Sequence, residues 1–478
     1  MDFFIDGRWT PASDGATAPV RNPATGEVVD TVPVGTQADA DRAIRSAAVA
    51  FESWRTVPTA KRAALQHAAA TLLRERADDM ARLLTLELGR PLAGTRVEVD
   101  RVADLLDYFA EEGLRISGEI PMINEANERV LVVKEPVGVV VAIAPFNYPL
   151  TLLTFKLGAA LVTGCTVVAK PASDTPLTTL RLAELFHDAG YPPGVFNAVT
   201  GSGGSFGRAL VEHPVPRKVA FTGSSGAGKR IAAMASATNK RVTLELGGQS
   251  PAIVCADADL DSAVPALVRH AYANSGQFCY RVNRMYAARE VYDELVGRFA
   301  AGAEALRLGN GLDAGTDLGP MVNEEIYSTS VEQVADARAK GARIVTGGQR
   351  LTGGDYDGGY FFPPTLIADT TPDMKIMCEE TFGPVVGIRP FDDLAEAIAQ
   401  ANDSPYGLAG YVFSRDVGTA LRIAESLEAG SVWVNDIHRS YNMVPFGGYK
   451  ESGLGREKSK HGLDAYLELK TIYLALGV

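Results

Sequence analysis

The first part of the chain has the hydrophobic spacing of amphipathic helices. From Ala40 onwards apolar residues recur at intervals of three and four, at Ala43, Ile44, Ala47, Ala48 and Phe51. Such a stripe is the face that a helix buries. Segments 61–88 and 93–112 also have helical character. We therefore predict a short hairpin region followed by three helical blocks.

Beyond residue 137 the pattern changes to short apolar runs that alternate with segments of helical length. The runs are 139–144, 166–170, 195–199, 218–221 and 242–246. Helices are predicted between them, at 150–163, 177–189, 206–212 and 227–235. This alternation predicts βαβ units, and continuously apolar strands are typical of a parallel sheet covered on both faces. It is the outline of a nucleotide-binding α/β domain.

A second alternation of the same style begins near Pro251. It predicts helices at 261–274, 291–306, 325–340 and 394–402. The strands expected with them are 284–287, 343–346, 385–390 and 410–413. The tail, 466–476, alternates apolar and polar residues and predicts one more strand, which could add to the sheet of a partner chain.

Composition narrows the class of protein. A length of 478 residues suggests two or three domains, and 46% hydrophobic with 22% charged residues is close to the globular average. The net charge of −12 argues against a nucleic-acid partner. Four scattered cysteines indicate neither a disulfide scaffold nor a metal site. The acidic first residues do not resemble a signal peptide, so a cytoplasmic location is expected.

One uncharged stretch, 136–155, is long enough to cross a membrane. Pro145 and Pro149 would break a spanning helix in its middle. A buried strand, a tight turn and a helix are the better interpretation, and no membrane partner is expected.

Two glycine-rich loops suit a phosphate at a helix N-terminus. Residues 200–207 nearly match the dinucleotide fingerprint, with Phe206 in place of its last glycine. Residues 223–230 nearly match a P-loop, but Arg230 stands where a hydroxyl would hold magnesium. A dinucleotide is therefore favoured, and a P-loop phosphotransferase remains an alternative.

Three residues stand out for their chemistry, although each has an ordinary explanation when taken alone. Cys279 could be a small buried hydrophobe. Glu245, at the end of an apolar run, could be a partnered structural carboxylate. Asn147, between prolines, could be a turn residue.

Seven motifs together give the chain a resemblance to the aldehyde dehydrogenase superfamily, in the family's order and over essentially the whole length. Its likeness is to the succinate-semialdehyde and lactaldehyde dehydrogenase-like members in particular. The motifs are 145–149 (Pro-Phe-Asn-Tyr-Pro), 170–173 (Lys-Pro-Ala-Ser), 221–224 (Phe-Thr-Gly-Ser), 244–248 (Leu-Glu-Leu-Gly-Gly), 276–279 (Gly-Gln-Phe-Cys), 379–384 (Glu-Glu-Thr-Phe-Gly-Pro) and 445–448 (Pro-Phe-Gly-Gly).

The resemblance implies an α/β fold with two Rossmann-related parallel-sheet domains and a small β oligomerisation arm. It assigns 1–117 and 138–247 to NAD(P) binding and 248–448 to a catalytic domain with the nucleophilic cysteine. Residues 118–137 and 460–478 would form the oligomerisation arm and tail of a homodimer or homotetramer.

The implied reaction is NAD(P)-dependent oxidation of a small aldehyde to its carboxylic acid, without a metal. Cys279 would add to the carbonyl as a thiolate, with Asn147 and the Cys279 backbone N–H as oxyanion donors. After hydride transfer, Glu245 would activate water to hydrolyse the thioester. Transfer to coenzyme A and a catalytically silent structural relative are the alternatives. Glu245 argues against transfer to coenzyme A. The presence of Cys279, Glu245 and Asn147 together argues against a catalytically silent relative.

The resemblance also places cofactor residues at both ends of the dinucleotide. The residues implied are Phe146, Lys170, Ser173, Gly203, Gly207, Ser224, Glu380 and Phe382. Neutral Ser173 stands where NAD-preferring members often have a glutamate, so NADP should at least be accepted, with NAD also possible. Asp174 is one residue further on and could restore some repulsion of a 2′-phosphate.

The substrate is less defined. Phe155 and Ala273 occupy the places of two arginines that hold the distal carboxylate in succinate-semialdehyde dehydrogenases. Succinate semialdehyde should therefore be a poor substrate unless another cation substitutes. Arg439, in the loop before Pro445, is one candidate for an anionic aldehyde, although it could equally be a surface charge. Phe155, Phe278 and Tyr280 would also suit an uncharged aldehyde.

Overall fold

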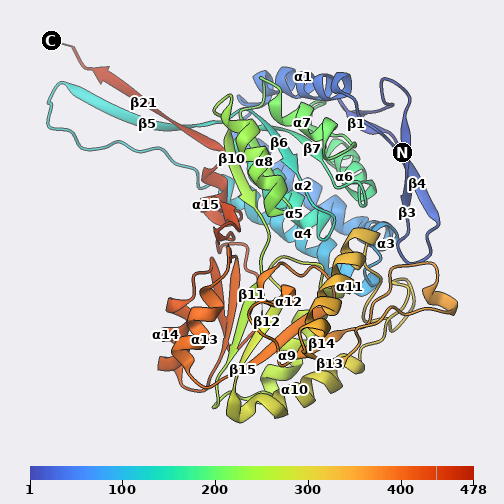
Figure 1. The fold of residues 1–478 in the computed structure, drawn as a ribbon. Helices are drawn as coiled ribbons and strands as arrows, with labels where there is room; N and C mark the ends of the chain where they lie inside the picture. The colour runs from blue at the N-terminus through green and yellow to red at the C-terminus, as the bar shows by residue number, and fades with distance from the viewer. Residues whose placement is uncertain (438, 478) are drawn as a thin grey trace.

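Two separate β-sheets, each flanked by helices, form the body of the molecule in the computed structural model (Figure 1). The structure describes residues 1–437 and 439–477. His438, in the loop that carries Arg439, and the terminal Val478 lie outside the described residues. The two sheets confirm the predicted α/β class.

The first sheet has eight strands within the described residues, in the order β2-β1-β8-β7-β6-β9-β10-β20. The strands β8, β7, β6, β9 and β10 run parallel. All five lie where the apolar runs predicted strands. In sheet order, the bounds are β2 Arg8–Thr10, β1 Phe3–Ile5, β8 Phe196–Ala198, β7 Thr166–Lys170, β6 Val139–Ile143, β9 Lys218–Thr222, β10 Arg241–Glu245 and β20 Gly453–Leu454.

The connections of this sheet are helical, as the pattern predicts. They are α5 (Pro149–Thr163), α6 (Leu177–Asp188), α7 (Ser205–Glu212) and α8 (Ser225–Ser236). The uncharged stretch 136–155 is a strand, a turn and the start of α5, as expected. No helix in the described part of the chain is long and apolar enough to span a membrane.

Helices from the N-terminal part of the chain pack beside the first sheet. They are α1 (Gln37–Trp54), α2 (Thr59–Glu75), α3 (Ala77–Leu88) and α4 (Leu92–Gly113). The single block predicted over 61–88 is wrong, because Arg76 leaves helical geometry (φ −102°, ψ 17°) and separates α2 from α3. Ahead of α1, β3 (Thr17–Arg21) and β4 (Val28–Pro33) form the predicted hairpin.

The second sheet has seven strands in the order β13-β14-β15-β12-β11-β17-β18, and only β13 is antiparallel to its neighbour among these described strands. The bounds in that order are Arg343–Thr346, Thr365–Ala368, Val385–Phe391, Val282–Ala288, Ser250–Val254, Ala409–Phe413 and Ser431–Val434. Its helices are α9 (Leu260–Tyr272), α10 (Arg289–Glu304), α11 (Glu324–Ala339), α12 (Lys375–Cys378), α13 (Leu394–Asn402) and α14 (Val417–Ser426).

Five of the described sheet strands and helices of this half were not expected from the sequence: β11, β14, β18, α12 and α14. In β11, Pro251 lacks an N–H and lies at a register shift, which is why the run does not look like a central strand. β14 and β18 are only four residues long. Such short elements leave little periodicity to detect.

The chain returns to the first sheet near its end. β20 pairs antiparallel with β10, so that Gly453 lies opposite Glu245. This segment falls in 449–459, which the sequence assigned to no domain. The small pair β16 (Tyr406–Gly407) and β19 (Tyr449–Lys450) precedes it, and α15 (Ser459–Asp464) follows it.

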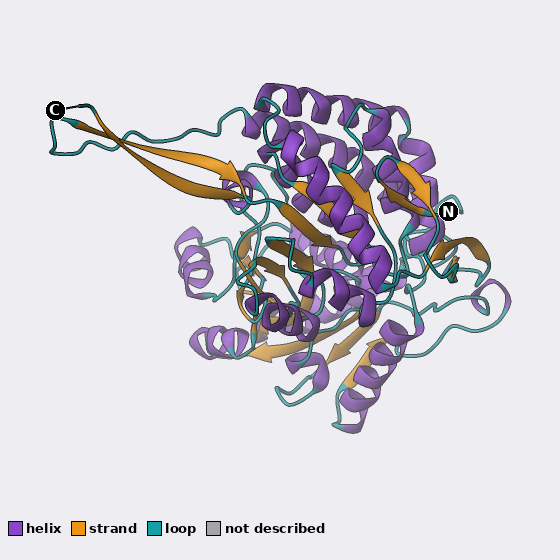
Figure 2. Cartoon of the chain, turned by 90° about the horizontal axis from the view of Figure 1, so that it is seen from above, coloured by secondary structure: helices purple, strands orange, loops and turns teal. Residues whose placement is uncertain are grey.

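A two-stranded ribbon projects from the body in both views (Figures 1 and 2). It pairs β5 (Glu128–Pro136) with the tail strand β21 (Leu467–Ala475), antiparallel over their full length. The tail is thus a strand, as predicted, and its partner is a strand of its own chain. Within the predicted arm segment 118–137, residues 118–127 contain only an isolated bridge, Glu119 to Val132, among the described pairings.

Candidate active site

Asn147 lies in the sharp turn between β6 and α5 and is 2% exposed. Its main-chain oxygen accepts hydrogen bonds from Arg90 Nη1 (3.4 Å) and Asn274 Nδ2 (3.2 Å), which fix the turn. Its buried side-chain Oδ1 has no hydrogen-bond partner among the described residues. A buried amide with an unused oxygen is costly in a purely structural role, which points to a functional one.

Cys279 is half-buried in the loop before β12. This loop begins with a 3₁₀ turn, Ala273–Gly276, in which Asn274 and Ser275 have positive φ angles (49° and 55°). A side chain at Gly276 would collide with the carbonyl oxygen of Gly383. Such strained backbone is typical of functional loops. Asn274 also donates to the Asn147 and Gln277 carbonyls, so the cysteine loop is tied to the Asn147 turn.

Electrostatics around the thiol keep it protonated in this state. Burial, followed by the nearby Glu380 and Glu245 carboxyls, raises the pKa of Cys279 well above its usual range. A thiolate here therefore needs a proton acceptor close by.

Glu245 ends β10, and its side chain is buried with both carboxyl oxygens unpartnered in the described part of the chain. Burial and the charge of Glu457 raise its pKa well above the usual value, although Lys156 and Arg456 oppose this. A carboxyl in this state can take a proton near neutral pH. The close approach of Gly447 to Glu245 Oε1 leaves no space there for a larger residue.

A buried ion pair lies behind Glu245. Lys156 Nζ, on α5, contacts Glu457 Oε1 at 2.7 Å and also donates to Thr222 Oγ1 (2.6 Å) and the Leu152 carbonyl (3.1 Å). This lysine therefore has a complete set of partners. Sequence reasoning missed both members of the pair, because they are far apart along the chain.

A largely apolar cavity opens in front of Cys279 and Asn147. Phe155, Phe278 and Tyr280 line it, as the sequence predicted. The other lining residues are Arg101, Tyr148, Thr151, Leu152, Ser440, Phe446 and Lys458. Two of these, Arg101 and Lys458, are cations that sequence reasoning missed, since no local motif marks them.

Arg439 is not among the described residues that line this cavity. Its side chain is 69% exposed, and its Nε contacts Asp436 Oδ2 at 2.6 Å. This exposed ion pair favours the surface interpretation of Arg439, and a role at the substrate mouth stays a prediction.

Residues expected at the adenine half of a dinucleotide lie on the first sheet. Lys170, at the end of β7, is buried, donates to the Pro171 carbonyl (3.1 Å), and has its pKa lowered to about 8 by burial. Ser173 is exposed, and Ser224 caps α8 by accepting from the Ala227 N–H (3.4 Å). A Cβ at Gly203 would meet nothing within 4 Å, so that loop leaves room for a ligand.

Gly207 likewise has no close neighbour beyond the Ser202 carbonyl oxygen, 3.7 Å from a hypothetical Cβ. The two glycines are therefore not required by packing within the chain. An open glycine loop, a helix N-terminus and a buried lysine with one main-chain partner fit a phosphate-bearing cofactor.

The expected nicotinamide-side residues lie between the two sheets. Glu380 Oε1 accepts the Gly248 N–H at 3.0 Å, and burial raises the Glu380 pKa to about 7. Phe382 meets Phe146 edge to face, with ring centroids 5.7 Å apart. Phe382 and Glu380 belong to the second half of the chain, whereas Phe146 adjoins β6, so this end joins the two halves.

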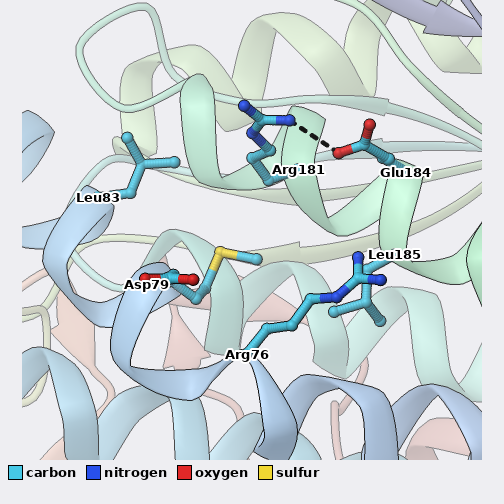
Figure 3. A pocket seen from close by; sticks show the side chains of 7 residues that line it. Arg76, Asp79, Leu83, Arg181, Glu184 and Leu185 are labelled. Carbon is cyan, nitrogen blue, oxygen red and sulfur yellow. Dashed lines mark hydrogen bonds and ion pairs between the residues drawn. The ribbon is translucent and has the colours of Figure 1, made fainter.

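A second hollow lies between α3 and α6, away from these residues (Figure 3). Its two arginines are paired, Arg181 with Glu184 (2.9 Å) and Arg76 with Asp188 (2.7 Å). Its lining contains no cysteine, histidine or serine among the described residues. Nothing in it matches the chemistry assembled at Cys279.

The chain belongs to the aldehyde dehydrogenase family, whose model matches residues 9–472. It is 44% identical to a glutarate-semialdehyde dehydrogenase of Pseudomonas aeruginosa, over 99% of this chain and 97% of that protein. It is 43% identical to the NADP(+)-type succinate-semialdehyde dehydrogenase GabD of Escherichia coli, over the same shares. A crystal structure of betaine aldehyde dehydrogenase from Staphylococcus aureus with NAD+ superimposes with a TM-score of 0.97 at 39% identity, covering 100% of this chain and 95% of the other.

The protein is therefore an NAD(P)-dependent aldehyde dehydrogenase that oxidises an aldehyde to a carboxylic acid. The family resemblance, the enzyme class and the cofactor class predicted from the motifs are confirmed. The P-loop phosphotransferase alternative is wrong, and the near-match at 223–230 is instead the turn after β9 together with the first residues of α8.

Proposed function

We propose that this enzyme oxidises a short aldehyde with an anionic group at its far end, with Cys279 as nucleophile and water as the final acceptor. The observation that carries the proposal is the cavity in front of Cys279, whose lining combines aromatic residues with two cations, Arg101 and Lys458. Relatives named for succinate and glutarate semialdehydes, both anionic aldehydes, support the substrate class.

The first step is addition of the Cys279 sulfur to the aldehyde carbon. The thiol proton passes to water and is the proton released overall, and the carbonyl oxygen becomes an oxyanion. The Asn147 Nδ2 and the Cys279 backbone N–H donate to that oxygen. One such donor contributes about 3 kcal/mol of transition-state stabilisation. NAD(P) held at the Glu380, Phe382 and Phe146 end of the site would supply the hydride acceptor, and loss of hydride from the former aldehyde carbon would leave a thioester on Cys279.

Hydrolysis then needs a base. Glu245 removes a proton from water, the hydroxide attacks the thioester carbon, and the Cys279 sulfur leaves with the proton restored to it. The products are the carboxylic acid and the reduced cofactor, with one proton released. Glu245, the water base, is what favours hydrolysis over transfer to coenzyme A.

Cofactor binding is assigned to the residues expected from the sequence. Lys170, Ser173 and Ser224 would hold the adenine and phosphate part, with Gly203 and Gly207 leaving room for it. Glu380, Phe382 and Phe146 would hold the nicotinamide end. Since Ser173 carries no charge, a 2′-phosphate meets no repulsion at this position, and NADP is accepted.

We also propose that the protein is a cytoplasmic homo-oligomer with three functional regions. Residues 1–117 and 138–247 bind the cofactor, 248–448 carry the nucleophile, and 118–137 with 460–478 form the arm. Support for the arm as an interface comes from its exposed apolar side chains, Leu469, Tyr473, Leu474 and Leu476. An isolated ribbon with such a surface gains stability by packing on another chain.

The test of the mechanism is the loss of the nucleophile. Cys279→Ala should reduce aldehyde-dependent formation of reduced cofactor by about four orders of magnitude or more. Cofactor affinity, measured by equilibrium binding, should stay near that of the unaltered protein. Cys378→Ala, at an exposed cysteine, is the matched control. Appreciable dehydrogenase activity in Cys279→Ala would remove the nucleophile assignment.

A further inference from the structure

Lys458 has a backbone conformation that lysine rarely adopts. It lies between β20 and α15, with φ 61° and ψ 177°. This region is almost restricted to glycine, because a Cβ crowds the backbone there. Strain of this kind persists where the rest of the structure requires it, and it concentrates at functional sites.

The lysine side chain is also buried without a counter-charge. It is 4% exposed, its Nζ donates to Ser440 Oγ at 2.6 Å, and it lies 5.8 Å from the centre of the Phe155 ring. Arg101, from α4, lines the same cavity. Among the described residues, neither cation has a carboxylate within 4.0 Å, whereas the buried Lys156 is paired with Glu457.

Burying an ammonium group is unfavourable unless an anion or hydrogen-bond acceptors compensate it. Here a strained lysine and a nearby arginine leave unmatched positive charge in a cavity that also contains Cys279. The missing anion must therefore come from outside the chain. Because this cavity is where the aldehyde reaches the thiol, the substrate itself is the natural source.

We propose that Lys458 is the specificity-determining residue of this enzyme. It binds the distal carboxylate of an aldehyde whose carbonyl carbon is held at Cys279, and Arg101 adds a second positive charge. The inference rests on the proposed function and deepens it. It also explains how a substrate carboxylate can be held although Phe155 and Ala273 occupy the places of the arginines expected for that task.

The experiment compares two aldehydes of equal carbon number, succinate semialdehyde and butanal, on a set of variants. Lys458→Gly removes the charge and suits the local φ, so it should fold with an unchanged or raised melting temperature. Lys458→Met keeps the chain length, and Lys458→Arg keeps the charge. Lys450→Gly is the matched control, because Lys450 also has a positive φ (50°) but pairs with Glu428 outside the cavity.

We expect Lys458→Gly and Lys458→Met to lower the kcat/KM ratio of succinate semialdehyde to butanal by about thirtyfold or more, mainly through KM. Lys458→Arg should keep the ratio within about fivefold, and Lys450→Gly within about twofold. A merely structural role would lower both rates together and leave the ratio unchanged.

Equal losses on both aldehydes would overturn the role of Lys458 and leave the proposed chemistry standing. A protein that prefers butanal to succinate semialdehyde before any substitution would overturn the inference as well. If the unaltered protein oxidised neither these aldehydes nor others, the proposed function itself would fail, which separates the two results.

Discussion

The hollow between α3 and α6 and the cavity at Cys279 each contain two cationic side chains, but they differ in how those charges are matched. In the hollow, Arg181 pairs with Glu184, as Figure 3 shows, and Arg76 pairs with Asp188, each within 3 Å. In the cavity, Arg101 and Lys458 have none among the described residues. The comparison shows that an opening in the surface is weak evidence of function, whereas unmatched buried charge is strong evidence.

The same contrast extends to the neutral and acidic groups. Glu245 has both carboxyl oxygens unpartnered in the described structure, and the Asn147 side-chain oxygen is also unpartnered. Folding alone would select against such atoms, because each one loses its hydrogen bonds to water. The Glu245 and Asn147 atoms lie near Cys279, where substrate, water or cofactor can complete their hydrogen bonds.

The largest effect on turnover is expected from a substitution of Glu245, one of the residues with unpartnered side-chain atoms. Glu245→Gln keeps the shape of the side chain but cannot take a proton from water. The thioester should form and then stall, giving a burst of reduced cofactor followed by turnover slowed about 10²- to 10⁴-fold. Stopped-flow absorbance measures both phases. Steady turnover at the normal rate would mean that another group activates water.

A second effect follows from the charge of Lys458. Burial, with a smaller contribution from Arg101, lowers the pKa of Lys458 to about 8. The ammonium is charged below this pH and neutral above it, so selectivity for the anionic aldehyde should be lost as the pH rises. The kcat/KM ratio of succinate semialdehyde to butanal should fall about tenfold between pH 7 and pH 9.

The rates with butanal are the control for this pH profile. A group that acts on both substrates changes both kcat/KM values and leaves their ratio unchanged. The charged and titratable groups around Lys458 are Arg101 on α4, Lys156 on α5, Glu457 next to it in the chain, and Tyr148, Cys279 and Tyr280 in the cavity wall. Burial raises the pKa of each of the last three above its usual value. A ratio that stays constant from pH 7 to pH 9 would contradict the prediction.

A third test concerns cofactor choice at the exposed Ser173. NADP should be used with a kcat/KM within about tenfold of that for NAD, since Ser173 does not repel a 2′-phosphate. Asp174 is the nearby acid, and one of its oxygens already accepts from Asn323 Nδ2 at 3.3 Å. Ser173→Glu should shift the preference toward NAD by tenfold or more. A preference for NAD of about a hundredfold in the unaltered protein, about 2.7 kcal/mol, would overturn this prediction.

The smallest effect is expected in the hollow. Arg181→Ala breaks an exposed ion pair with Glu184, which contributes about 0–1 kcal/mol to the free energy of unfolding. Activity on every aldehyde should stay within about twofold, because the hollow is not connected to the reaction. Kinetics and thermal unfolding check both statements. A tenfold loss of activity in Arg181→Ala would contradict the view that the hollow, with its paired arginines, has no part in the reaction.

Much of this fold and the central residues of its site could be predicted from the sequence. The continuous apolar strands of the first sheet and the Asn147, Glu245 and Cys279 motifs are local signals, readable within a few residues. Arg101 and Lys458 could not be found in this way. Arg101 belongs to α4 and Lys458 precedes α15, and only the packing of α15 against α4 brings these distant segments to one cavity.

The direction of the Arg439 side chain could not be read from the sequence either. An arginine in a loop near the motif 445–448 looks like a substrate residue, but its direction depends on the Asp436 carboxylate three residues earlier. The break at Arg76 is a different case, since nothing in the hydrophobic spacing of 61–88 marks a change of helix axis.

The pairing of β20 with β10 has a consequence for biosynthesis. During translation, β10 and its terminal Glu245 leave the ribosome long before Gly453 and Leu454, which cover that edge of the sheet. Until then β10 is an open edge, the segment with Lys458 does not exist, and β5 lacks the strand that pairs with it. Nascent chains are therefore exposed to mispairing along these edges for a large part of their synthesis. A ribosome that stops shortly before residue 453 would release a protein that has Cys279 but neither a closed sheet nor a complete site.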